Sequence, residues 1–94
     1  MPNIELHGFG DKNSVNAKEM REKVFSLFLG KEEILKEIVV TIYSNDVQDY
    51  KGNAQPFIRV VTTPGHDHIF IVGRLRFLNV DIEVGFLEYF YPKT

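Results

Sequence analysis

Pro2 is the residue of this sequence with the clearest potential for chemistry, because it directly follows the initiating methionine. Removal of Met1 would leave the backbone nitrogen of Pro2 as a secondary amine. Burial in apolar surroundings, or a neighbouring cation, lowers the pKa of such an amine toward neutrality. An amine in that state can take a proton from one atom of a substrate and return it to another, which is general acid–base catalysis. The alternative is that Pro2 is an incidental second residue.

Other reactive groups are scarce. The chain has no cysteine, which excludes disulfides, zinc–thiolate sites and cysteine nucleophiles. The segment His66-Asp67-His68 offers two imidazoles and a carboxylate. Its spacing lacks a third ligand and favours a loop and helix-capping role, so we predict no metal. His7 lies on the polar side of an expected strand, where it is structural, at a subunit contact, or close enough to Pro2 to tune it.

The charge balance narrows the possible partners. Eleven basic and thirteen acidic residues give a formal net charge of -2, with no basic patch typical of nucleic-acid binding. No apolar run approaches the roughly 18 residues of a membrane span, and nothing resembles a signal peptide. Small secreted domains usually carry disulfides, so their absence favours the cytoplasm. We therefore expect a cytoplasmic protein with neither nucleic-acid nor membrane partners.

The first half of the chain has a clear periodicity. Residues 3–7 alternate in polarity around Ile4 and Leu6, which predicts a half-buried strand. A helix follows over residues 15–29, with Asn16 or Ser14 as its N-cap and Gly30 at its end. Its apolar face comprises Ala17, Met20, Val24, Leu27 and Phe28.

The rest of the chain contains two more strands before its second long helical segment. One short helical turn is possible at 31–36, and a strand is predicted at 38–43. The polar segment 44–55 is predicted to be a long loop, and a further strand follows at 57–63. Residues 67–78 fit either a helix or a strand. A helix is favoured there because Asp67 can cap it and Asn79 follows it. Residues 80–86 alternate as a final strand.

The predicted order is therefore β-α-β-β-α-β in a single domain over residues 1–94. The fold class is α+β: two βαβ units form one four-stranded sheet with two helices on one face. Two folds commonly have this order, the ferredoxin-like fold and the tautomerase fold.

Three segments resemble the tautomerase superfamily, which includes 4-oxalocrotonate tautomerase and macrophage migration inhibitory factor. They are Pro2-Asn-Ile-Glu-Leu-His7, the helix ending at Leu29-Gly30-Lys31, and Ile38-Val-Val-Thr-Ile42. Asp49-Tyr50-Lys51-Gly52 resembles the aromatic and glycine stretch after the second strand of that family. The resemblance implies a cofactor-free keto–enol tautomerase with Pro2 as its acid–base group. A chain with two βαβ units resembles the longer members, which implies a homotrimer.

The resemblance also implies a substrate-binding set. Lys12 matches an arginine after the first strand in the short members, Lys31 matches a lysine after the first helix in the longer ones, and Tyr50 matches their pocket aromatic. A cation near the amine would bind a substrate carboxylate and lower the pKa of the amine. The sequence departs from the family at Val39, where the short members carry a second arginine. The arginines that could replace it are Arg59, Arg74 and Arg76.

Three hypotheses for function follow. The first is a tautomerase acting on a small carboxylated enol or keto acid. The second is a non-catalytic oligomeric binding protein of the same fold. The third is a ferredoxin-like ligand-binding regulatory module in which Pro2 is incidental. The aromatic residues at 86–94 add to the expectation of a homotrimer, although they could also cover the chain's own core.

Overall fold

A computed structural model describes residues 2–10, 16–43, 45–62 and 66–86. In chain order its elements are β1 (Asn3–His7), α1 (Ala17–Ser26), α2 (Glu32–Leu35), β2 (Val39–Tyr43), β3 (Phe57–Thr62), α3 (His66–Leu75), a 3-10 turn (Arg76–Leu78) and β4 (Asp81–Phe86). The strands predicted from sequence are confirmed, with ends that differ by no more than one residue. The first helix is confirmed with a shorter extent than 15–29.

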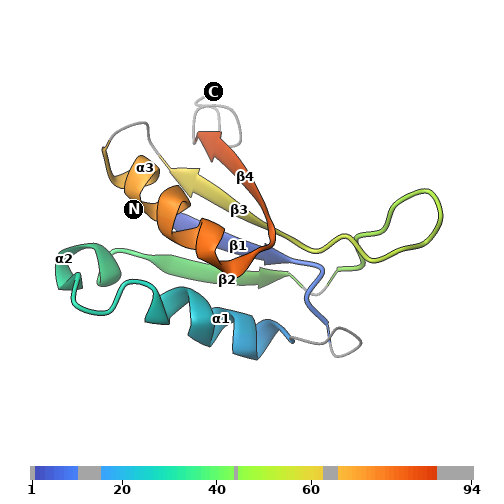
Figure 1. Ribbon diagram of the computed structural model, residues 1–94, viewed down its shortest axis with the longest axis horizontal. Coiled ribbons are helices and arrows are strands. Elements are labelled where there is room, and N and C mark those ends of the chain that lie inside the picture. Colours follow the sequence, from blue (N-terminus) through green and yellow to red (C-terminus); the bar gives the residue numbers. More distant parts are fainter. Residues whose placement is uncertain (1, 11–15, 44, 63–65, 87–94) are drawn as a thin grey trace, which may run out of the picture.

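The four strands form one mixed sheet in the order β2-β1-β3-β4 (Figure 1). β1 pairs with β2 in parallel, and β3 pairs with β4 in parallel. The central pair, β1 with β3, is antiparallel. The fold therefore consists of two βαβ units joined side by side, as expected for a small α+β domain.

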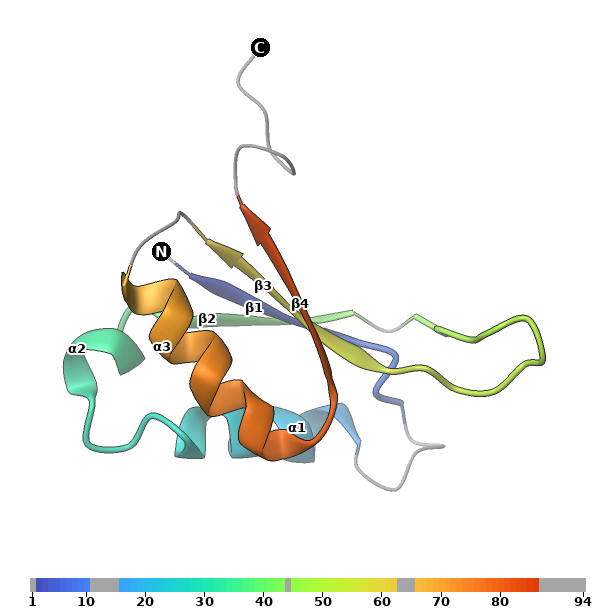
Figure 2. The same ribbon diagram turned by 45° about the horizontal axis from the view of Figure 1, so that its top comes forward.

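Both long helices lie on the same side of the sheet, as Figure 2 shows. α1 begins where the Asn16 side chain accepts a hydrogen bond from the Glu19 N–H at 2.9 Å. It buries Met20 and Val24 against the sheet, and α3 buries Ile71 and Leu75. The sheet adds the fully buried side chains of Ile4, Leu6, Ile58 and Val60, and Phe28, which follows α1, is also fully buried in this core.

The ambiguous segment 67–78 is helical. Ile71 and Leu75 lie four residues apart, which puts both on the same helical face and buries both completely. The 3-10 turn that follows ends at Asn79 in a left-handed conformation with φ 56°. The structure also contains α2 as a third helix, where the sequence allowed one short turn. No helix within the described residues is long and apolar enough to span a membrane.

Candidate functional site

Pro2 lies buried at the start of β1. Its carbonyl oxygen accepts a hydrogen bond from the Val39 N–H at 3.0 Å, which fixes this end of the chain against β2. The Pro2 nitrogen is part of the peptide bond with Met1 in the chain as written, so an amine arises there only when Met1 is removed. The candidate base therefore belongs to a fixed backbone position next to the first residue of β2.

Lys31 lies at the same end of the sheet. It immediately precedes α2, and α2 leads through Ile38 into Val39, the residue hydrogen-bonded to Pro2. Gly30, with φ +86°, turns the chain into this position. The Lys31 side chain is exposed, and its ammonium forms no ion pair with a described carboxylate. Lys31 is therefore available to an anionic ligand.

Tyr50 lies at the opposite end. We call residues 45–56 the arm; this segment follows β2 and projects beyond the sheet, away from the N-terminus and α2 (Figures 1 and 2). The Tyr50 side chain is 92% exposed, with the Lys51 ammonium 5.6 Å from its ring centre. Within one chain, Pro2 and Tyr50 are thus separated by the length of the sheet. A site containing both needs a second copy of the chain.

Lys12 lies outside the described residues. Among the arginine candidates, Arg59 is engaged with two carboxylates and Arg74 lies 5.1 Å from the Phe70 ring centre. Arg76 contributes to an open hollow of about 390 Å³ between α3 and β4. These arginines belong to β3, to α3 and to the turn after it, so none is carried by β1, α2 or β2, the elements that hold Pro2 and Lys31.

A polar network missed by the sequence analysis occupies the sheet face without helices. His7 stacks between the rings of Tyr43 and Phe57, at centroid distances of 4.3 and 4.6 Å. Its Nε2 lies 2.8 Å from a carboxylate oxygen of Glu5, and its Nδ1 lies 3.2 Å from the side-chain nitrogen of Asn45. Glu5 and His7 are 3% and 7% exposed, although none of the helices that the structure describes covers this face.

The hydrogen bonds assign a direction to this network. The Asn45 side-chain oxygen accepts the Gly8 N–H at 2.9 Å, so its amide nitrogen donates to His7 Nδ1. His7 Nε2–H then donates to Glu5. With both ring nitrogens engaged, the imidazole has no position left for a metal or a substrate. His7 is also about 16 Å from Pro2 along the extended strand, which excludes direct tuning within one chain and favours a structural role.

Arg59 extends the network across the sheet. Its Nε and Nη2 donate to one carboxylate oxygen of Glu83 at 3.2 and 3.1 Å, and Nη1 lies 3.5 Å from Glu5. The sequence signal for this network is the alternation of polar residues within each strand. The sequence does not reveal which strands pair, and so it does not predict that these polar residues meet.

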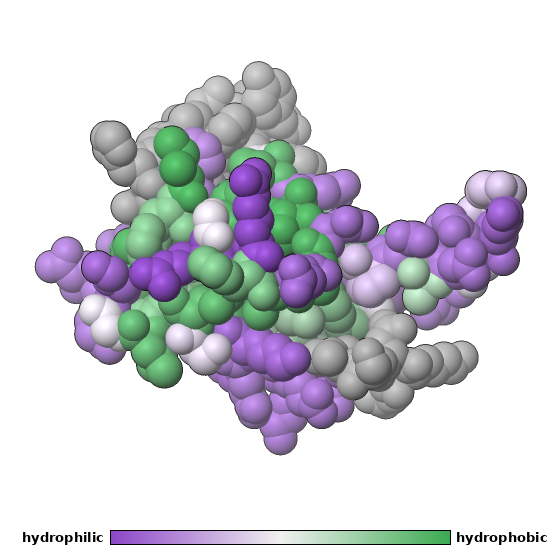
Figure 3. All heavy atoms as spheres, in the orientation of Figure 1, coloured by the Kyte–Doolittle hydropathy of each residue, from purple (hydrophilic) through white to green (hydrophobic). Residues whose placement is uncertain are grey.

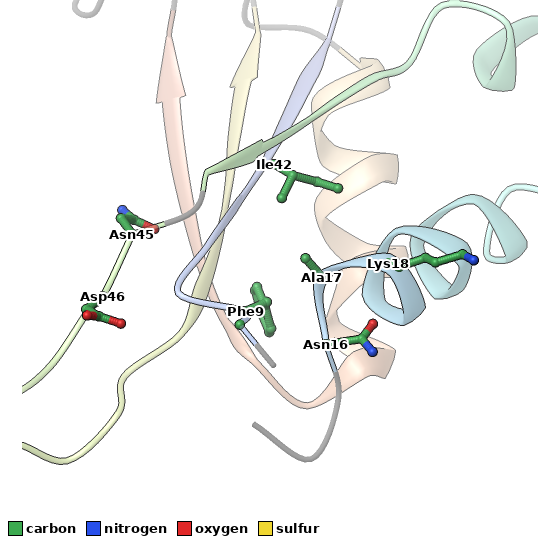
Figure 4. A pocket seen from close by; sticks show the side chains of 8 residues that line it. Phe9, Asn16, Ala17, Lys18, Ile42, Asn45 and Asp46 are labelled. Carbon is green, nitrogen blue, oxygen red and sulfur yellow. The ribbon is translucent and has the colours of Figure 1, made fainter. Parts of the chain in front are cut away.

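An open hollow of about 530 Å³ lies between the end of β2 and the start of α1 (Figure 4). Phe9 and Ile42 point into it, Asn45 and Asp46 border it from the arm, and the Lys18 side chain runs away from them along α1. It lies at the end of the sheet away from Pro2 and Lys31. Lys18, Asn45 and Asp46 are exposed at its border, so it has the character of a surface depression and not of a reaction site.

Within the part of the chain that the structure describes, no group of three or more suitable metal ligands converges. The sequence matches no protein-family model and has no significant match among curated proteins or solved structures.

Proposed function

We propose that this chain is a cofactor-free keto–enol tautomerase acting on a small carboxylated enol or keto acid. The amine of Pro2, exposed when Met1 is removed, serves as its acid–base group. The observation that carries the proposal is the buried, backbone-fixed position of Pro2 at the start of β1, with the cation of Lys31 at the same end of the sheet.

The proposed mechanism needs a neutral amine. Burial at the start of a strand lowers the pKa of an amine by desolvation, and a nearby ammonium adds like-charge repulsion in the same direction. Pro2 then removes a proton from the enol oxygen or from carbon and delivers it to the other position. Lys31 holds the substrate carboxylate during this transfer, and Lys12 is a second candidate for that role.

The proposed assembly is a homotrimer with shared sites. Tyr50 of one chain lies too far from its own Pro2 to close a pocket there, so in this proposal it closes the site of a neighbouring copy. A shared site is consistent with the exposure of both Lys31 and Tyr50 in the single chain.

The arrangement of strands weighs against a ferredoxin-like regulatory module. In a split βαβ arrangement the two strands of a unit are separated by another strand. Here β1 lies directly beside β2, and β3 directly beside β4. The tautomerase-like fold is the better proposal for this topology.

The test is turnover of a generic enol acid, phenylenolpyruvate, by protein whose mass shows that Met1 is absent. An N-terminal extension blocks the amine and should reduce turnover by at least the factor of about 10²–10⁴ that acid–base groups contribute. Pro2→Ala replaces the secondary amine with a primary one and should retain part of the activity. Full turnover in the N-terminally extended protein would eliminate Pro2 as the base.

The kinetic constants of a Lys31 variant provide a second test. Lys31→Ala should raise KM for carboxylated enols more than it lowers kcat, since it removes a contact to the unreacting carboxylate. Lys36→Ala is the matched control, because Lys36 is also an exposed lysine and lies at the other end of α2. Equal effects of the two substitutions on KM would show that Lys31 acts only through the overall surface charge and does not contact the substrate.

A further inference from the structure

The hydrogen bonds of His7 hold its imidazole in the neutral form. The Asn45 side-chain oxygen accepts the Gly8 N–H at 2.9 Å, which leaves the amide nitrogen of Asn45 to face His7 Nδ1 at 3.2 Å. An amide N–H can donate only to a ring nitrogen that carries no proton. While Asn45 is bonded to Gly8 in this way, the amide group therefore opposes a proton on Nδ1.

The charged groups around His7 favour the opposite state. Within β1, the Glu5 carboxylate lies 2.8 Å from Nε2 of the ring. Arg59 of β3 lies 3.5 Å from the same carboxylate and binds Glu83 of β4 at 3.1 Å. Two carboxylates and one guanidinium leave one negative charge uncompensated, and an imidazolium at His7 would balance it.

The other described neighbours of His7 add no positive charge. Its two ring faces are covered by Tyr43 of β2 and Phe57 of β3, aromatic rings without charge at neutral pH. Beyond Phe57, the paired residue on β4 is Asp81, a further carboxylate. Among these neighbours, the donor of Asn45 is the group that conflicts with a proton at Nδ1.

Asn45 can resolve this conflict without any movement of the core. Its side chain is exposed, and a half-turn of the amide exchanges the positions of its oxygen and nitrogen. The oxygen then accepts the Nδ1–H of His7, while the nitrogen faces the Gly8 N–H, donor against donor. The adjacent Asp46 is also exposed, so solvent screens its charge. The hydrogen bond between Gly8 and Asn45 is therefore lost in the second orientation.

That hydrogen bond ties the base of the arm to the end of β1. Gly8 has φ +82°, and a Cβ at this position would lie 3.3 Å from Val47 and 3.2 Å from Pro56, one on each side of the arm. Only glycine fits this close approach without strain. Figure 3 shows that the surface of the projecting arm is almost wholly hydrophilic, so polar bonds of this kind carry much of its attachment to the sheet.

We propose that His7 and Asn45 form a pH-sensitive switch that loosens the base of the arm when His7 takes up a proton. Protonation places an N–H at Nδ1, the Asn45 amide turns to offer its oxygen, and the Gly8 N–H loses its acceptor. Histidine ordinarily changes charge between pH 5 and 8. The bond between Gly8 and Asn45 is complete at the upper end of that range and is lost as the pH falls through the titration of His7. The position of the arm relative to the sheet then depends on pH, whether or not Pro2 transfers protons.

NMR of the full chain between pH 8 and 5 tests the switch. The ¹⁵N shifts of the His7 ring should show a proton on Nε2 alone at pH 8 and on both nitrogens at pH 5. Amide exchange, corrected for its intrinsic pH dependence, should show the protection of Gly8 falling at the same midpoint by roughly threefold to tenfold, the equilibrium factor of one hydrogen bond. Lys51 and Asn53 should keep their protection, because Asp49 holds them. Constant protection of Gly8 through the titration overturns the proposal, as does a neutral ring protonated at Nδ1 or a ring still neutral at pH 5.

Asn45→Asp separates the turning of the amide from other effects of pH. A carboxylate accepts from the Gly8 N–H and from a protonated Nδ1 at the same time. The protection of Gly8 should therefore stay constant between pH 8 and 5, and His7 should take up its proton at a higher pH than in the parent. Gln48→Glu is the matched control, since it adds the same charge at another exposed residue of the arm, and it should keep the pH response of the parent. Circular dichroism establishes that both variants are folded. A pH response of Gly8 in folded Asn45→Asp as large as in the parent overturns the proposal.

Discussion

The two faces of the sheet bury the side chains of β1 by different means. On the face covered by α1 and α3, Ile4 and Leu6 are fully buried among apolar neighbours. On the face without helices, Glu5 and His7 are almost as well buried, beneath aromatic rings and an arginine from the adjacent strands. A second layer of helices is therefore not required to bury a strand on both sides. The condition is that each buried polar atom finds a partner within the sheet.

The covered face should carry the larger share of the stability. Leu6→Ala removes a fully buried side chain and leaves a cavity that the two helices cannot easily close, at an expected cost of about 2–5 kcal/mol in the free energy of unfolding. Denaturant unfolding followed by circular dichroism measures this loss. A cost below that of the substitutions on the open face would reverse the comparison.

On the open face, substitution of the buried carboxylate of Glu5 should lower the free energy of unfolding substantially. Glu5→Ala removes the acceptor of the His7 Nε2–H and a partner of Arg59, and we expect a loss of about 1–3 kcal/mol. Glu5→Gln is the control, because the amide oxygen still accepts from His7 and the loss should be smaller. Equal losses for the two variants would indicate that charge, and not the hydrogen bond, stabilises this face.

The second ion pair of Arg59, with Glu83, should contribute less to the free energy of unfolding. The Glu83 side chain is 54% exposed, against 4% for Glu5, although its contacts with Arg59 are shorter. Exposed ion pairs contribute about 0–1 kcal/mol, so Glu83→Ala should have a small effect on unfolding. A loss as large as that of Glu5→Ala would show that Arg59, and not the burial of the carboxylate, sets the stability of the open face.

Local sequence patterns were sufficient for the covered face. The alternation around Ile4 and Leu6 predicts β1, and a cap at Asn16 with apolar residues at helical spacing predicts α1, because these signals depend on neighbours in the chain. The helix over 66–75 was harder to predict, since residues 74–77 also alternate like a strand. There the burial of Ile71 and Leu75 against the sheet decides the conformation.

The open face could not be predicted in the same way. The same alternation that buries Leu6 predicts that Glu5 and His7 face solvent, yet both are buried by contacts with strands far along the chain. Arg59 is 54 residues from Glu5 in sequence, and no local pattern encodes their proximity. For the candidate site, the sequence could nominate Pro2, Lys31 and Tyr50 individually. Their division between opposite ends of the sheet follows only from the direction of β1 and β2.

The smallest and most local change in stability is expected in the arm, which belongs to neither face of the sheet. Hydrogen bonds from the backbone N–H of Asn53, and then of Lys51, lower the pKa of Asp49 below its ordinary value of 3.8, against the opposing effect of desolvation. The carboxylate is favoured by the folded arm, so its contribution is complete above that ordinary value. It is lost as the pH falls through the lower pKa of the folded state.

Acid should therefore loosen the arm below about pH 4 without unfolding the sheet in the same step. Amide exchange measured by NMR should show Lys51 and Asn53 losing protection first, while Leu6 and Val60 keep theirs. Asp49→Asn should produce the same local loss at neutral pH, because a neutral amide oxygen is a weaker acceptor than a carboxylate. Asp46→Asn is the matched control on the same arm, since the carboxylate hydrogen bonds that hold the turn belong to Asp49. Simultaneous loss of protection in the arm and the sheet would show that the arm is part of the cooperative core, and the separation between arm and sheet would then fail.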